Sequence, residues 1–203
     1  MKKWFSPARS FSLILFSSCA SLCLTATLSL AAPAQVVILR HGEKPDVGND
    51  LSPQGYARAK GLVAFFQTSP LITKFGTPVA LYAASPVHDD GSVRSIETLT
   101  PTSQALKLPL HTQFNKHQIP EMVREILGTS AYDNKTVIIC LPHASIPETA
   151  HQFGAVHAPA DWTQGAYDRV WILGFAHGQV TSFQDRPEHV LPGDSAQLRA
   201  HHN

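Results

Sequence analysis

The sequence has very little cysteine. Only three of its 203 residues are cysteine, and two of them, Cys19 and Cys23, fall in an apolar N-terminal segment. Cys140 is therefore the single cysteine of the remaining chain, which excludes an intramolecular disulfide scaffold there. No CxxC pattern occurs, and the eleven histidines include no HExxH motif, so the sequence offers no recognisable metal site. Because Cys140 lies in an apolar run typical of a buried strand, we expect it to be an inert packing residue.

An excess of charge of one sign is also absent. The chain has 16 Lys and Arg against 15 Asp and Glu, and the first 34 residues hold three of the basic residues and no acidic one, which leaves 13 against 15. This balance gives no electrostatic reason to expect nucleic acid or an anionic membrane as a partner. Charged residues make up 15% and hydrophobic residues 43%, a composition typical of one compact globular domain.

The N-terminal segment is typical of a secretory signal. Lys2, Lys3 and Arg9 precede an uncharged apolar run that ends at Leu30. Small residues follow, and cleavage is expected after Ala31 or after Ala34. We therefore predict a signal peptide over residues 1–34, a domain over residues 35–203, and export to the periplasm or the medium. Contact with a membrane is expected only if the leader is retained as an anchor.

Apolar runs of strand length alternate with segments that have helix start signals. The first helix is expected to begin with Ser52 as its N-cap and Pro53 at its first position. Such alternation favours a mainly parallel sheet that is covered by helices on both faces. The expected strands are 36–39, 79–83, 136–141 and 170–175, with weaker ones at 108–111 and 179–183, and the expected helices are 52–67, 95–106 and 120–128.

Basic residues follow several of these strands. Arg40 and His41 come directly after the first strand, and Arg94, His143 and His177 follow later ones. Ligands of parallel sheets collect at the carboxyl ends of the strands, so these groups are expected to converge on one pocket. Guanidinium groups match the geometry of phosphate oxygens, and two arginines with a protonated histidine would neutralise a phosphate without metal. A second, neutral imidazole could then attack phosphorus in line.

Four sequence motifs, in a fixed order along the chain, resemble those of a known protein family. The segments "LRHGEKP", "LSPQGYARA", "SPVHDDGSVRSIETLTPTSQAL" and "CLPHASIPETA", followed by "YDRVWIL" and "LPGD", resemble the histidine phosphatase superfamily, which includes the phosphoglycerate mutases. The resemblance extends from Val36 to about Asp194, nearly the whole chain after the leader. It implies a three-layer α/β/α sandwich with a mostly parallel sheet, of the phosphoglycerate mutase-like type. It implies no metal and no organic cofactor.

The resemblance also implies a role for each matched residue. His41 is expected to be the nucleophile that becomes phosphorylated, and Arg40 and Arg94 are expected to bind the phosphate. His143 is expected to complete the pocket as a donor to the transferring group, and Lys44 is a further candidate for phosphate contact. If Lys44 does not contact phosphate, it is expected to form a solvated ion pair with Glu43. Arg58, on the following helix, is expected to be structural.

The general acid is the weak point of the pattern. Many mutase-like relatives place a glutamate between the second arginine and the second histidine, but "LHTQFNKHQ" has no carboxylate there, and Pro142 and Ala144 flank His143. Glu148 and Asp89 are the first candidates, ahead of Asp90 and Glu121. Without a strong acid the enzyme would be slow on alkyl phosphates, since protonation of the leaving group typically contributes about 100- to 10,000-fold. Aryl phosphates and anhydrides would depend on it less.

The sequence as a whole predicts an exported, metal-independent phosphatase that hydrolyses phosphomonoesters through a phosphohistidine. Its expected partner is a small phosphorylated substrate, and an envelope sugar phosphate would suit an exported enzyme. Three alternatives stay open. They are a non-catalytic phosphate-binding module of the same fold, a phosphomutase, and a metal-binding or structural envelope protein.

Overall fold

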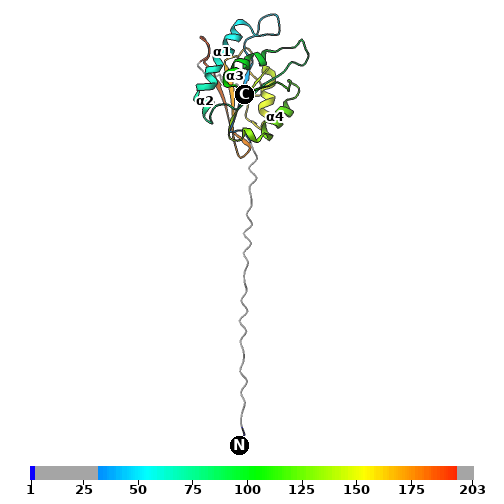
Figure 1. Ribbon diagram of the computed structural model, residues 1–203. Coiled ribbons are helices and arrows are strands. Elements are labelled where there is room, and N and C mark those ends of the chain that lie inside the picture. The colour runs from blue at the N-terminus through cyan, green and yellow to red at the C-terminus, as the bar shows by residue number, and fades with distance from the viewer. Residues whose placement is uncertain (3–31, 196–203) are drawn as a thin grey trace.

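The computed structural model describes residues 1–2 and 32–195, so the predicted signal peptide lies almost entirely outside the described residues (Figure 1). Among the described residues, no helix has both the length and the apolar character needed to cross a membrane. The elements in chain order are β1 (Gln35–Arg40), α1 (Pro53–Thr68), α2 (Pro70–Thr73), β2 (Ala80–Ala83), α3 (Arg94–Leu106), β3 (Leu110–His111), α4 (Ile119–Gly128), η1 (Ser130–Tyr132), β4 (Thr136–Leu141), η2 (His143–Ser145), α5 (Ile146–Gln152), β5 (Arg169–Ala176) and β6 (Gln179–Pro187).

The strands form one six-stranded sheet in the order β3-β2-β4-β1-β5-β6. β3, β2, β4 and β1 are parallel to one another, which confirms the prediction of a mainly parallel sheet. β5 runs antiparallel to β1, and β6 runs antiparallel to β5. A tight turn joins β5 to β6, and both His177 and Gly178 in it have positive φ angles. Such a short turn can connect only antiparallel neighbours.

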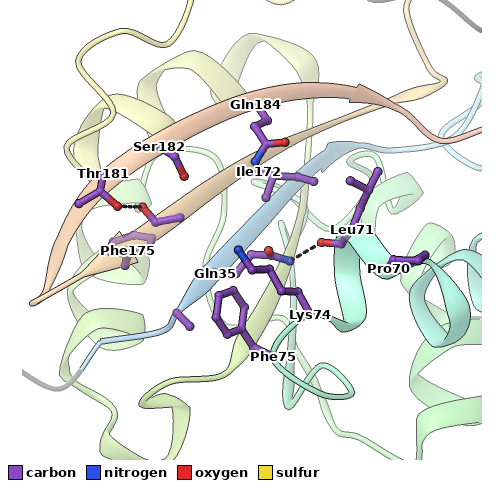
Figure 2. A pocket seen from close by; sticks show the side chains of 12 residues that line it. Gln35, Pro70, Leu71, Lys74, Phe75, Ile172, Phe175, Thr181, Ser182 and Gln184 are labelled. Carbon is purple, nitrogen blue, oxygen red and sulfur yellow. Dashed lines mark hydrogen bonds between the residues drawn. The ribbon is translucent and has the colours of Figure 1, made fainter.

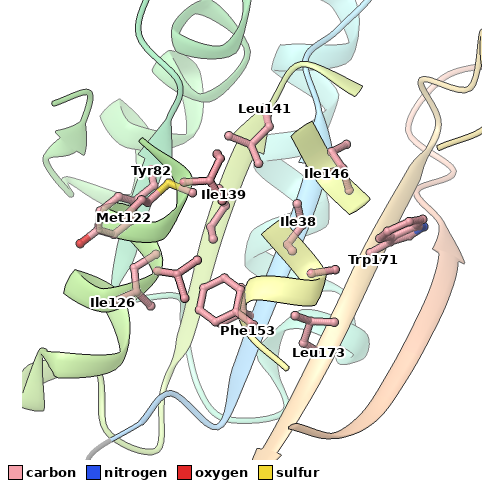
Figure 3. Packing of buried hydrophobic residues seen from close by; sticks show 14 of the residues in the cluster. Ile38, Tyr82, Met122, Ile126, Ile139, Leu141, Ile146, Phe153, Trp171 and Leu173 are labelled. Atoms are coloured by element: carbon pink, nitrogen blue, oxygen red, sulfur yellow. The ribbon is translucent and has the colours of Figure 1, made fainter. Parts of the chain in front are cut away.

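Helices cover both faces of the sheet, as the predicted three-layer sandwich requires. Side chains of a strand alternate between its two faces, so Val36 and Ile38 of β1 pack on the side of α4 and α5 (Figure 3). Val37 and Leu39 pack on the other side, with residues of α1, α2 and α3. All four are fully buried. The central strands are therefore apolar on both faces, which explains their continuous apolar runs.

The predicted helices are all present, with small changes at their ends. Ser52 caps α1, and its Oγ accepts a hydrogen bond from the Gly55 amide at 3.1 Å. α3 begins one residue before the predicted segment, at Arg94, and α4 also begins one residue early, at Ile119. Two further helices, α2 and α5, were not predicted. They have four and seven residues, and such short helices are too brief for a helical period to show in the sequence.

The loop that follows β1 lies directly against the first turn of α1. A Cβ atom at Gly42 would lie 2.9 Å from the carbonyl oxygen of Gly55. A Cβ atom at Gly55 would lie 2.9 Å from the amide nitrogen of Glu43, and closer still to its carbonyl oxygen. The same carbonyl accepts a hydrogen bond from the Ser52 amide at 2.8 Å. Only glycine at both positions allows the two backbones to approach this closely.

We expect Gly55→Ala to destabilise the fold by about 1–3 kcal/mol, because the added methyl group must displace backbone atoms rather than a flexible side chain. Gly128→Ala is the matched control, because Gly128 ends α4 and has open space around its Cβ position. That variant should be as stable as the parent or slightly more stable. Urea unfolding of the three proteins measures the effect, and equal stability of Gly55→Ala and Gly128→Ala would contradict it.

Candidate active site

A cavity of about 400 Å³ opens where the parallel strands β1, β2 and β4 end. Arg40 and His41 enter it from the end of β1, Arg94 from the start of α3, and His143 from the segment after β4. Lys44 lines it as well. The structure therefore brings together all the predicted phosphate ligands and the predicted nucleophile, although their positions in the sequence span more than a hundred residues.

His41 is fixed in one ring orientation. Its side chain is 6% exposed, and its Nδ1 lies 2.8 Å from the carbonyl oxygen of Gly42. Because a carbonyl oxygen can only accept, Nδ1 must carry the hydrogen, which leaves the lone pair on Nε2. The Gly42 amide donates to Oγ1 of Thr98 at 2.8 Å, which holds the peptide before Gly42 next to the one whose carbonyl orients the ring. This is the tautomer that an attacking imidazole needs.

The surroundings of His41 favour its neutral form. Burial is the main cause that lowers its pKa to about 4, and the nearby positive charges of Arg40, Arg94 and His143 act in the same direction. The hydrogen bond to Gly42 opposes the shift without reversing it. A neutral imidazole is nucleophilic, so His41 is ready to attack at any pH well above 4.

Arg40 is buried and rigidly held. It is 5% exposed, its guanidinium lies 3.8 Å from the centre of the Tyr167 ring, and Nη2 donates to the Tyr167 hydroxyl at 3.0 Å. Nη1 reaches the carbonyl oxygen of Ala166 at 3.4 Å. Its Nε is buried and has no hydrogen-bond partner among the described residues. Burial lowers the pKa of Arg40, and an anion in the cavity would offset the cost of burying the charge.

Arg94 is anchored by a loop that sequence analysis did not connect with it. Its Nε donates to the carbonyl oxygen of Asp50 at 2.9 Å, and Nη2 donates to that of Gly48. Backbone carbonyls leave the charge of the guanidinium uncompensated, in contrast to a carboxylate. Arg94 therefore enters the cavity as a positioned cation with capacity for an anionic ligand.

His143 follows Pro142 and begins the short helix η2. Burial is the main cause that lowers its pKa, and the charges of Arg40 and Lys44 add to the effect. A doubly charged phosphate in the cavity would reverse this repulsion and favour the imidazolium. His143 can thus take up a proton as the ligand binds and donate a hydrogen bond to it.

The two first candidates for the general acid do not lie in the cavity. Asp89 is exposed on the loop between β2 and α3, and Glu148 is exposed on the first turn of α5. Neither lines the cavity, and Asp90 and Glu121 do not line it either. No Asp or Glu is among its lining residues. The cavity does include polar residues that the sequence analysis did not single out, namely Ser85, His88, Ser92, Ser95 and Lys116.

The expectation that His177 joins the other basic groups is wrong. β5 runs antiparallel to β1, so its carboxyl end lies at the opposite edge of the sheet, where Gly174 pairs with Gln35 at the start of β1. His177 lines a cavity of only about 40 Å³ at that edge. A larger cavity of about 200 Å³ lies at the same edge, lined by Gln35, Lys74 and others, and holds no candidate site residue (Figure 2).

Glu43 does not pair with Lys44 in solvent, as the sequence had suggested. It forms a two-pronged ion pair with Arg58 of α1, with the closest atoms, Nη2 and Oε1, 2.8 Å apart. Arg58 is 2% exposed and also binds Asp194 at 2.8 Å and Glu188 at 3.1 Å. Burial alone would lower the pKa of Arg58, and the hydrogen bonds to Asp194 and Glu43 more than reverse this. Arg58 lies outside the cavity and is structural, as predicted.

Cys140 is fully buried in β4, and burial raises the pKa of its thiol, in agreement with the predicted packing role. Within the part of the chain that the structure describes, no group of three or more His, Cys, Asp or Glu side chains is arranged to hold a metal ion.

Comparison with known proteins places the fold. No protein-family model matches the sequence, and no curated protein matches it either. Solved structures do match: the protein histidine phosphatase SixA in complex with tungstate has 14% identity over 76% of this chain and 97% of its own, with a TM-score of 0.50. Phosphoglycerate mutase from Plasmodium falciparum has 13% identity over 81% and 98%, with a TM-score of 0.51. The fold is that of the histidine phosphatase superfamily.

A third structure with this fold agrees with the first two. The alpha-ribazole phosphatase from Shigella flexneri has 10% identity over 72% of this chain and 93% of its own, with a TM-score of 0.50. The histidine phosphatase fold is therefore present in nearly its full length, although the sequences have diverged widely. The resemblance predicted from the four motifs is confirmed for the fold.

We expect the ring of His41 to titrate near pH 4, well below the ordinary histidine value of about 6.5. His41 then stays neutral as the pH falls from 7 to 5. NMR of the ring in the ligand-free protein measures the midpoint. Arg94→Met should move it upward, because the variant removes a repelling charge. A midpoint near 6.5 in the parent protein would contradict the site described above.

Proposed function

We propose that this protein is an exported, metal-independent phosphatase that hydrolyses phosphomonoesters through a phosphohistidine at His41. The observation that carries the proposal is the fixed tautomer of His41 inside a cavity that Arg40, Arg94 and His143 make cationic. The histidine phosphatase fold supports the phosphatase class. The SixA structure of this fold holds tungstate, which is a tetrahedral oxyanion like phosphate.

In the first step, Nε2 of His41 attacks phosphorus opposite the leaving oxygen. The bond from phosphorus to that oxygen breaks, the electron pair stays on the oxygen, and the leaving group takes up a proton from solvent. Arg40 and Arg94 bind oxygens of the transferring group and offset the charge that it carries in the transition state. His143 gains a proton as the dianion binds and donates a hydrogen bond to the same group. Because these side chains are already positioned, most of the catalytic effect comes from orientation and electrostatics.

In the second step, water hydrolyses the phosphohistidine and releases inorganic phosphate. The bond between Nε2 and phosphorus breaks, and the electron pair returns to the imidazole. The low pKa of His41 favours this step, because a weakly basic nitrogen is a good leaving group. Nδ1 keeps its hydrogen bond to Gly42 throughout, so the ring returns to its starting tautomer.

One observation favours a second candidate, a non-catalytic phosphate-binding module of the same fold. No carboxylate lines the cavity, so no strong general acid stands ready for the leaving oxygen. Such a module would bind phosphate through the same arginines without turnover. A phosphomutase has less support, because export would separate it from phosphorylated metabolites of the cytoplasm. An envelope sugar phosphate is the substrate that would suit an exported phosphatase.

We expect the purified protein to hydrolyse para-nitrophenyl phosphate in the presence of a chelator, because an aryl leaving group depends little on protonation. His41→Ala should lower kcat by at least about 1,000-fold, since it removes the nucleophile. Quenching in base during turnover should trap one phosphate per chain, and later treatment with acid should release it. Release of para-nitrophenolate and the mass of the quenched protein are the measurements.

His111→Ala is the matched control, because His111 is a histidine of β3 outside the cavity. It should keep the turnover and the trapped phosphate. Binding of inorganic phosphate by calorimetry, without turnover on para-nitrophenyl phosphate, would establish the binding module instead. Turnover that survives His41→Ala would exclude the phosphohistidine.

The same proposal makes a prediction about export, since residues 32–34 pack into the domain. The Ala32 carbonyl accepts from the Asn134 amide at 3.1 Å, and Ala34 exchanges backbone hydrogen bonds of 2.9 Å with Lys135 and Phe175. Cleavage after Ala34 would remove these contacts, so we expect the exported chain to begin at Ala32. Intact mass of the protein from a bacterial periplasm measures this. A chain that begins at Gln35, or one that retains the leader, would contradict it.

A further inference from the structure

The cavity is larger and more basic than a single phosphate requires. Its volume of about 400 Å³ compares with about 30 Å³ for one water molecule in the liquid, so a phosphate held by His41 and Arg94 fills only a part of it. The remaining wall includes Lys44, Lys116 and His88. Because no Asp or Glu lines the cavity, these groups are not neutralised within it. The part beyond the reacting phosphate is therefore suited to more negative charge on the substrate.

Lys116 is held at the cavity by a defined turn. Ser85, at the end of β2, forms a bridge with Asn115, and the Ser85 amide donates to the Phe114 carbonyl at 2.9 Å. The turn is closed by a hydrogen bond of 3.0 Å from the Gln118 amide to the Asn115 carbonyl. Lys116 thus comes from the segment after β3. In the sheet, β3 and β1 lie on opposite sides of β2, and Arg40 and His41 are at the end of β1. A second anionic group of the substrate would therefore contact Lys116 at a place separate from the reacting phosphate at His41.

The missing carboxylate limits the leaving group. An alkoxide is strongly basic, so an alcohol leaves readily only when an acid protonates it, and this typically contributes about 100- to 10,000-fold. A phosphate leaving group is weakly basic and departs as an anion without that help. Cations stabilise it as its charge develops. A site with lysines and without a carboxylate is better matched to an anionic leaving group than to an alcohol.

We infer that the preferred substrate is a phosphoanhydride, in which the leaving group is itself a phosphate or a polyphosphate. This inference rests on the proposed function and adds the substrate class. Nε2 of His41 attacks the terminal phosphorus, the bond from phosphorus to the bridging oxygen breaks, and the electron pair stays on the departing phosphate beside Lys44 and Lys116. Water then attacks the phosphohistidine, orthophosphate leaves, and the proton of the water passes to solvent.

The test compares three substrates with the full-length domain in the presence of a chelator. They are inorganic tripolyphosphate, para-nitrophenyl phosphate and glycerol 3-phosphate, and kcat/KM is measured for each. We expect tripolyphosphate to exceed glycerol 3-phosphate by at least about 100-fold, which is the lower end of the contribution that a general acid makes. Lys116→Met should lower the ratio of tripolyphosphate to para-nitrophenyl phosphate at least about fivefold.

Lys60→Met is the matched control, because Lys60 is an exposed lysine of α1 that does not line the cavity. It should leave that ratio unchanged. Equal kcat/KM for glycerol 3-phosphate and tripolyphosphate, or an unchanged ratio in Lys116→Met, would overturn the inference about the substrate class. If para-nitrophenyl phosphate were still hydrolysed in that case, the proposed phosphatase function would stand. Absence of turnover on all three substrates would instead overturn the proposed function.

Discussion

The contact between the loop after β1 and the first turn of α1 is the constraint on which the site depends. Gly42 and Gly55 bring the two backbones together, and Arg58, one turn further along α1, binds the carboxylate of Glu43. The peptide that joins Gly42 to Glu43 is the one whose carbonyl fixes the ring of His41. Breaking a buried ion pair of this kind typically costs about 3–5 kcal/mol, so the loop has little freedom to move. His41, the proposed nucleophile, is thus oriented by packing between glycines and by an ion pair outside the cavity.

Charge is divided between two neighbouring regions of the molecule. Arg58 gathers Glu43, Glu188 and Asp194, whereas the cavity holds arginines, lysines and histidines without a carboxylate. Burial raises the pKa of Glu188, and the ion pair with Arg58 opposes this shift, while its Oε1 has no hydrogen-bond partner among the described residues. Glu43 acts on Arg40 from outside the cavity, but its carboxylate is hydrogen-bonded to Arg58 and does not line the cavity itself. Repulsion among the cations of the cavity favours an anionic ligand.

The side chains of the candidate site could be predicted from the sequence because each of them follows a buried strand or begins a helix. Parallel strands end at one edge of the sheet, so Arg40, His41 and His143 had to meet once the sheet was known. The failures have physical causes too. Apolar runs do not reveal strand direction, and the antiparallel β5 carries His177 to the other edge. Neither the anchoring of Arg94 by backbone carbonyls nor the position of Lys116 leaves a pattern in the sequence, because both depend on how irregular loops fold.

Arg40 links the cavity to a part of the chain that has little regular structure of its own. Residues 153–168, between α5 and β5, form no helix or strand, and Arg40 contacts them through Ala166 and Tyr167. Nε1 of Trp162 donates to the same Ala166 carbonyl at 3.0 Å, so this carbonyl accepts hydrogen bonds both from within the segment and from Arg40. Local opening of the segment and occupancy of the cavity are therefore thermodynamically linked through one guanidinium. A phosphate bound to Arg40, as proposed, would therefore be expected to slow amide hydrogen exchange in a segment that lies outside the cavity wall.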